Sequence, residues 1–151
     1  MKALRPILLV EDNLKDIELT LAALRENKLV NDLVVARHGG EALDYLFRWG
    51  KFENWPAGDP LVAFLDLKMP KVDGLEVLRQ MKADEALKVI PVIMLTSSKE
   101  EVDLVKSYRL GVNAYVVKPV GFEQFVEAIK QLGMFWAILN EPPPSPSDGT
   151  G

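Results

Sequence analysis

Cysteine is absent from the 151-residue sequence, which excludes a disulfide framework and any thiol chemistry. No apolar run approaches the length of a membrane span, and the N-terminus lacks the apolar segment of a signal peptide. Basic residues do not gather in a stripe, and the net charge of −4 argues against a nucleic-acid-binding surface. We therefore expect one soluble, cytoplasmic domain whose partners are neither nucleic acids nor membranes.

The chain does contain five short apolar runs that alternate with amphipathic helical patterns. Such short, continuous runs are typical of strands that are buried on both faces of a sheet. Their alternation with helices predicts the doubly wound α/β class, a parallel sheet with helices on both faces. The five expected strands are Ile7–Val10, Leu33–Ala36, Leu61–Leu65, Val92–Leu95 and Ala114–Val117.

A helical pattern follows each expected strand. The first has an apolar stripe that predicts one buried face, formed by Leu14, Ile17, Leu21 and Leu24. Two others begin with the spacing of a capping box, in which Asp73 precedes Glu76 and Ser98 precedes Glu101 by three residues. We expect the helix that begins after Ser98 to reach about Leu110.

Polar side chains stand where four of the strands end. Glu11-Asp12 follow the first strand, Asp66 the third, Thr96-Ser97 the fourth and Lys118-Pro119 the fifth. A lone carboxylate inside an apolar strand would lose its hydration, whereas at the strand's end Asp66 can reach water and ions. The carboxyl ends of parallel strands form the edge where ligands bind, so we expect one site around Asp66.

The residue types at this edge suit phosphoryl chemistry. Three carboxylates would raise one another's pKa, and a divalent cation such as Mg2+, which prefers oxygen ligands, removes that cost. An aspartate can attack phosphorus, while Lys118 and the Thr96 hydroxyl would contact phosphoryl oxygens. Taken singly, Glu11 and Asp12 could be helix N-terminal charges, Lys118 a solvated side chain and Thr96 a strand end. The presence of all these residue types at one edge of the sheet favours a phosphoryl-binding site.

At these residues the sequence resembles the response-regulator receiver domain, over about Lys2 to Leu139. The resemblance implies a flavodoxin-like fold whose five strands lie in the order 2-1-3-4-5. The motifs that carry it are Leu9-Val10-Glu11-Asp12-Asn13, Leu65-Asp66-Leu67-Lys68-Met69-Pro70 with Asp73-Gly74, Leu95-Thr96-Ser97 and Tyr115-Val116-Val117-Lys118-Pro119.

The resemblance also implies a reaction, in which Asp66 accepts a phosphoryl group from the phosphohistidine of a histidine kinase. Lys118 and Thr96 would hold phosphoryl oxygens. The implied Mg2+ ligands are Glu11, Asp12, Asp66 and the backbone carbonyl of Lys68. The Lys68 side chain is free at this position, and we predict that it alters the lifetime of the phosphorylated form.

A switch is implied as well. Thr96 would move toward the phosphoryl group and Tyr115 would turn inward, which changes the surface of the fourth helix, fifth strand and fifth helix. The Lys118–Pro119 bond is expected to be cis, a conformation that a bond preceding proline permits at modest cost. The switched surface would bind a partner or relay to a histidine phosphotransfer protein.

A second resemblance concerns the loop 51–56 and the segment Met134-Phe135-Trp136. Both are similar to single-domain regulators paired with bacterial and cyanobacterial phytochrome kinases. The resemblance implies that the phosphoryl donor is a light-sensing histidine kinase.

The end of the last helix is apolar nearly all round, more than one core-facing stripe needs. This predicts a homodimer, unless the helix end folds over its own core. The expected interface residues are Tyr115, Phe135, Trp136 and Leu139. We expect a receiver domain over 1–139 with an extended C-terminal helix, and a disordered tail over 140–151, which is rich in Pro, Ser and Gly.

Other functions on this layout fit less well. A flavin carrier would need a phosphate-binding loop where Glu11-Asp12 stand, and an aspartyl phosphatase a second aspartate in place of Lys68. A pseudo-receiver that binds partners without phosphorylation is disfavoured by the intact acidic set. The lone histidine, His38, lies between Arg37 and two glycines and is expected at the surface. We therefore expect a signalling protein rather than an enzyme, with a separate phosphoryl donor.

Overall fold

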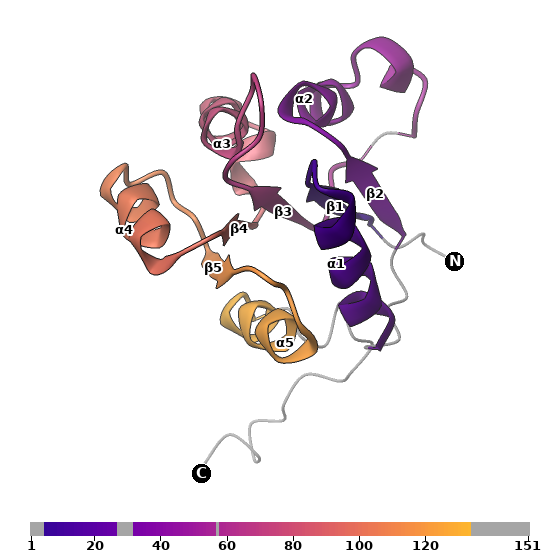
Figure 1. Ribbon diagram of the computed structural model, residues 1–151. Helices are drawn as coiled ribbons and strands as arrows, with labels where there is room; N and C mark the ends of the chain where they lie inside the picture. Colours follow the sequence, from indigo (N-terminus) through magenta and orange to yellow (C-terminus); the bar gives the residue numbers. More distant parts are fainter. Residues whose placement is uncertain (1–4, 27–31, 57, 134–151) are drawn as a thin grey trace, which may run out of the picture.

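The computed structural model describes residues 5–26, 32–56 and 58–133. Its centre is a five-stranded parallel sheet with the strand order β2-β1-β3-β4-β5, which confirms the expected flavodoxin-like topology. Helices cover both faces of the sheet (Figure 1). The strand order changes direction beside β1, and in open α/β sheets ligands bind at the carboxyl ends of the strands near such a point.

The strands are short because each apolar run ends at a turn or a polar residue. β1, β3 and β4 are buried along their whole length, whereas β2 lies at one edge of the sheet and is half-buried. Asp66 and Thr96 are the last residues of β3 and β4, so both belong to the sheet itself. The strands are β1 Ile7–Val10, β2 Leu33–Ala36, β3 Val62–Asp66, β4 Val92–Thr96 and β5 Ala114–Val117.

Two cores lie on opposite faces of the sheet, as the alternation of side chains in β1 shows. Leu8 and Val10 pack toward α2 and α3, and Ile7 and Leu9 pack toward α1 and α5. The helices are α1 Leu14–Glu26, α2 Gly39–Phe47, α3 Gly74–Ala83, α4 Lys99–Ser107 and α5 Phe122–Gln131, with short 3-10 helices η1 Gly50–Phe52 and η2 Leu87–Val89.

The expected helix starts are confirmed by their caps. Asp73 Oδ1 accepts a hydrogen bond of 3.0 Å from the Glu76 backbone N–H at the start of α3. Ser98 Oγ accepts one of 3.3 Å from the Glu101 N–H at the start of α4. Each cap satisfies a backbone donor that the helix itself leaves unpaired.

Two details of the helix predictions are wrong. The side chain of Leu14 is 60% exposed, because it is the first residue of α1 and stands past the end of β1 instead of over the sheet. Helix α4 ends at Ser107 and does not reach Leu110. Arg109 has a φ of 51°, in the left-handed region, and this conformation ends the helical path.

The Lys118–Pro119 bond is cis, as the resemblance implies. The predicted interface residues Phe135, Trp136 and Leu139 and the tail 140–151 lie outside the described residues. None of the described helices has the length and apolar character needed to cross a membrane.

Candidate functional site

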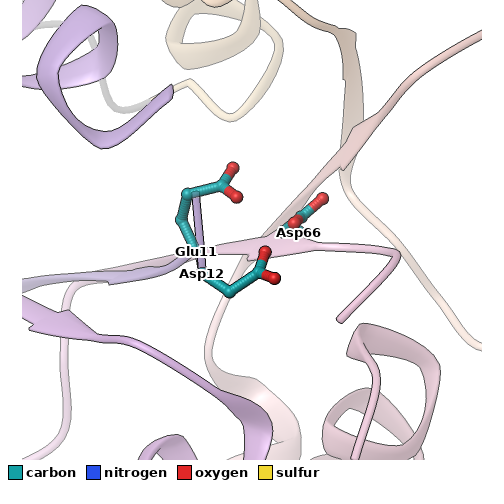
Figure 2. A group of neighbouring side chains, drawn as sticks. All are labelled: Glu11, Asp12 and Asp66. Atoms are coloured by element: carbon teal, nitrogen blue, oxygen red, sulfur yellow. The ribbon is translucent and has the colours of Figure 1, made fainter. Parts of the chain in front are cut away.

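Three carboxylates meet at the carboxyl edge of the sheet (Figure 2). Glu11 and Asp12 follow β1, and Asp66 ends the neighbouring strand β3. One oxygen from each lies within 4.8 Å of the others, which is close enough for a shared metal ion. Glu11 Oε1 is buried and accepts no hydrogen bond from any described residue; its charge is met by the Lys118 ammonium, in an ion pair that a metal ion would have to share. The donor set of hard oxygens therefore fits the expected Mg2+.

Lys118 reaches this cluster from the end of β5, as predicted. Its Nζ lies 2.9 Å from Glu11 Oε1 and 3.0 Å from Asp66 Oδ1. The Lys118 side chain is only 15% exposed, so these charges interact with little screening by water. The ammonium thus stands where it can reach a phosphoryl group on Asp66.

A fourth acid, Asp16, was not predicted from the sequence. It lies in the first turn of α1, and its Oδ2 accepts a hydrogen bond of 3.0 Å from Lys118 Nζ. The only local signal was an acidic residue in the first helical turn after Glu11-Asp12, and that position alone suggests a favourable helix charge. Its pairing with Lys118 depends on the fold.

The environment shifts the pKa values of both central groups. Burial, followed by the neighbouring Glu11 carboxylate, raises the pKa of Asp66 to about 8, although the Lys118 ammonium lowers it. Burial alone would lower the pKa of Lys118, but its three carboxylate partners outweigh burial and raise that pKa above its ordinary value. The lysine therefore stays charged. The carboxyl groups of the site outnumber this single positive charge.

The two switch candidates lie on neighbouring strands. Thr96 is buried, and its hydroxyl donates to the Ser98 carbonyl oxygen over 3.3 Å, toward the loop before α4. Tyr115 is half-buried on β5, and the Lys106 ammonium lies 5.5 Å from the centre of its ring. Both residues therefore border α4 and β5, the elements in which the switch is expected.

The side chain of Lys68 reaches the first turn of α4. Its Nζ forms an ion pair of 2.8 Å with Glu101 Oε2, and the Lys68 side chain is 75% exposed. The other oxygen of Glu101 accepts a hydrogen bond of 2.7 Å from the Ser97 N–H. This ion pair was not predicted, because the capping-box spacing of Glu101 indicates only a role at the start of α4.

The backbone around the site is fixed by two close approaches. A Cβ on Gly74 would stand 2.3 Å from the Asp66 carbonyl oxygen, so only glycine lets α3 begin this close to β3. Arg37 Nη2 donates to the Asp12 carbonyl oxygen over 3.2 Å, which ties the end of β2 to the acidic loop. Neither role was predicted from the sequence.

The long segment between α2 and β3 packs through aromatic rings. The ring of Trp55 lies edge-on to Phe52 at 4.8 Å and to Tyr45 at 6.0 Å, while Trp49 stacks on Phe47 at 4.7 Å. A cavity of about 840 Å3 lies between this segment and β2. Its lining includes none of the three clustered carboxylates, so the cavity is separate from the candidate site.

Comparison with known proteins agrees with this geometry. Residues 7–130 match the family model described as the response regulator receiver domain. The chain belongs to the response-regulator receiver family. Response regulator Rcp1 of Synechocystis sp. is 38% identical over 130 residues, which cover 86% of this chain and 87% of Rcp1.

Two solved receiver structures share a higher identity with this chain, and a third is of Rcp1 itself. The bacteriophytochrome response regulator AtBRR is 64% identical, with a TM-score of 0.86, over 93% of this chain and 100% of AtBRR. The bacteriophytochrome response regulator RtBRR is 63% identical, with a TM-score of 0.87, over 93% of this chain and 85% of RtBRR. A structure of Rcp1 in its Mn2+-bound form is 37% identical, with a TM-score of 0.71, over 87% of this chain and 94% of that one.

This receiver domain therefore acts as a phosphoacceptor in two-component signalling, with a histidine kinase as its partner. It is a signalling protein and not a classical enzyme. The family match explains why acids from two strands and a lysine from a third meet at one edge of the sheet.

Proposed function

We propose that Asp66 is the phosphoacceptor and that the reaction depends on Mg2+ bound by Glu11, Asp12, Asp66 and the Lys68 carbonyl. The observation that carries this proposal is the position of Lys118 Nζ, 3.0 Å from Asp66 Oδ1, beside three acids that can share a metal ion. When bound, Mg2+ would supply positive charge against the phosphoryl oxygens and help to align the group.

In the proposed reaction an Asp66 carboxylate oxygen attacks the phosphorus atom of the donor's phosphohistidine. A phosphorus–oxygen bond forms, the phosphorus–nitrogen bond breaks, and the imidazole leaves with the bonding electrons. Only the ionised carboxylate is a nucleophile, and its raised pKa makes the positive charges around it important. Lys118 would then donate a hydrogen bond to a phosphoryl oxygen, and Thr96 to another.

Intact mass spectrometry after incubation with acetyl phosphate tests this assignment. The parent should gain the mass of one phosphoryl group when Mg2+ is present and should gain none when the metal is chelated. Asp66→Asn, which keeps the size and removes the nucleophile, should gain none in either case. Phosphorylation of Asp66→Asn to the same extent as the parent would exclude Asp66 as the acceptor.

We infer that the phosphoryl donor is a kinase of the phytochrome class. The support is the 63–64% identity to two bacteriophytochrome response regulators, over 93% of this chain. A purified, autophosphorylated bacteriophytochrome kinase should transfer its phosphoryl group to this chain within minutes. Equal transfer from a histidine kinase of another class would remove the support for this pairing.

Phosphorylation is proposed to switch the surface of α4, β5 and α5 through Thr96 and Tyr115. This surface would bind a downstream partner such as a histidine phosphotransfer protein. Thr96→Ala should still accept the phosphoryl group from acetyl phosphate but should lose the change in Tyr115 surroundings. The amide spectrum of β5, recorded with and without phosphorylation, would detect that loss, and an unchanged response in Thr96→Ala would contradict it.

We further propose a cytoplasmic homodimer that joins through Tyr115, Phe135, Trp136 and Leu139. The receiver domain would span 1–139, with its final helix extended past Gln131 and a disordered tail over 140–151. The support is the apolar character of residues 134–139 in the sequence. Phe135→Ala/Trp136→Ala should sediment as a monomer beside a dimeric parent. Equal sedimentation of the two would refute the interface.

A further inference from the structure

The ammonium of Lys118 is shared by three carboxylates, and only two of them belong to the metal-competent cluster. Glu11 and Asp66 each contribute an oxygen to that cluster, whereas Asp16 does not. The contact with Asp16 also has hydrogen-bond geometry, while Glu11 Oε1 accepts no hydrogen bond from any described residue. Asp16 is thus an acceptor for Lys118 that a metal ion would leave free.

The positions of the groups create a competition for two acids. A divalent cation held by Glu11 and Asp66 would stand close to the Lys118 ammonium, and the two positive charges would repel each other. The ammonium would then have to leave those oxygens or weaken its contact with them. Without another anion nearby, the cost of moving a charged group that is only 15% exposed would count against metal binding.

Asp16 is such an anion, and it lies on a different secondary-structure element from the metal-competent acids. It projects from the first turn of α1, its side chain is 28% exposed, and its Oδ2 already lies 3.0 Å from Lys118 Nζ. The ammonium can keep this hydrogen bond while it yields the metal-competent oxygens. It would also remain within the site, where a phosphoryl oxygen on Asp66 could later accept from it.

We propose that Asp16 is a positioning residue that holds the Lys118 ammonium when a divalent cation occupies the acidic cluster. Asp16 therefore strengthens metal binding through Lys118, without being a metal ligand itself. This inference rests on the metal site of the proposed function.

The test is a double-mutant cycle that measures Mn2+ affinity from the electron paramagnetic resonance signal of the free ion. Asp16→Asn keeps the shape of the side chain and should weaken Mn2+ binding by about three- to tenfold, the scale of a partly screened charge pair. Lys118→Met should tighten binding, because the competing cation is gone. In the Lys118→Met background, Asp16→Asn should change the affinity by less than about twofold.

A matched control removes the same charge from the same helix. Glu18 is exposed on α1, and Glu18→Gln should change Mn2+ affinity by less than about twofold, the effect of a screened surface charge. Circular dichroism and the thermal midpoint of each variant verify that the fold is intact. Asp16→Glu, which restores the charge, should recover part of the lost affinity.

Three outcomes would overturn the inference. Equal affinity of the parent and Asp16→Asn would show that Asp16 does not act on the metal site. An equal loss with and without Lys118 would assign the effect to direct charge or ligation by Asp16. A parent that binds no Mn2+ would overturn the metal site as well, whereas the first two outcomes leave the proposed function intact.

Discussion

Lys68 Nζ lies 2.8 Å from Glu101 Oε2, so an ion pair joins the loop after β3 to the first turn of α4. Glu101 is also held by the Ser97 N–H, which donates to its other oxygen. The Glu101 carboxylate therefore links Lys68 to the loop after β4. In that loop, the Ser98 carbonyl oxygen accepts the hydrogen bond of the Thr96 hydroxyl. Two loops that border the phosphoacceptor are tied together outside the acidic cluster.

The first prediction concerns the lifetime of the phosphorylated form. Lys68→Ala removes both the long side chain beside the site and the tie to α4, so water should reach the phosphoryl group more easily. We expect dephosphorylation to become about threefold faster, a change of about 0.6 kcal/mol in barrier height. The decay of the phosphorylated mass after removal of acetyl phosphate measures this rate.

Glu101→Gln serves as the control for that prediction, because it breaks the same tie and keeps the Lys68 side chain. A rate between those of the parent and Lys68→Ala would separate the two contributions. Equal decay of the parent and Lys68→Ala would refute a role for this side chain.

The second prediction is a pH dependence of stability. The hydrogen bond from Lys68, then that from the Ser97 N–H, lower the pKa of Glu101 from its ordinary value of 4.5. Since the folded pKa is the lower one, the stabilisation is present above 4.5 and is lost as the pH falls through the folded value. Glu101→Gln should therefore be less stable than the parent at neutral pH and nearly equal to it in acid. Urea unfolding at several pH values measures this, and a difference independent of pH would contradict it.

The fold could be predicted from the sequence because strands buried on both faces appear in it as short, continuous apolar runs. Runs such as Ile7–Val10 are apolar on both faces, and the positions of Glu11 and Asp66 after such runs place them at one edge of the sheet. Leu14 misled the helix prediction because periodicity does not reveal where a helix extends past the sheet.

Ion pairs between residues far apart in the sequence have no comparable sequence pattern. Asp16 and Lys118 are 102 positions apart, and their contact depends on how α1 packs beside α5, the helix that follows the Lys118 loop. The same holds for Lys68 and Glu101, whose residue types are common on any surface. Charges of opposite sign are too frequent in a sequence for their pairing to be predicted without the fold.

A third prediction concerns His38, which is a helix cap in this structure. Its Nδ1 accepts a hydrogen bond of 3.0 Å from the Glu41 N–H at the start of α2. His38→Ala should cost about 1 kcal/mol in the free energy of unfolding, while His38→Asn, which can also cap, should cost less. Both variants should be phosphorylated like the parent. Loss of phosphorylation in His38→Asn would show that this histidine takes part in the reaction.

A fourth prediction tests the core between the sheet and α5. The rings of Phe64 and Phe125 are both fully buried and stack with centres 5.8 Å apart. Phe125→Ala should lower the free energy of unfolding by about 3–5 kcal/mol, because the cavity adds to the lost burial. Phe125→Leu, which refills most of the space, should cost much less. Urea denaturation measures both, and a loss below about 1 kcal/mol in Phe125→Ala would contradict this packing.

The last prediction links the start of α3 to the phosphoacceptor. An alanine Cβ at Gly74 would meet the Asp66 carbonyl oxygen at 2.3 Å and the Leu67 Cα at 3.1 Å, both of them backbone atoms that cannot turn aside. Gly74→Ala must therefore displace the end of β3 or the start of α3. We expect a loss of about 1–3 kcal/mol in stability and slower phosphorylation by acetyl phosphate, because the Asp66 carboxylate shifts relative to its partners.

Gly40→Ala provides the matched control, since Gly40 also lies in the first turn of a helix. A Cβ there would meet the His38 ring at 3.2 Å, and a side chain can adjust where a backbone cannot. This variant should keep the parent's phosphorylation rate and its stability within about 1 kcal/mol. If Gly74→Ala also matched the parent in both measurements, the close approach of α3 would not be what positions Asp66.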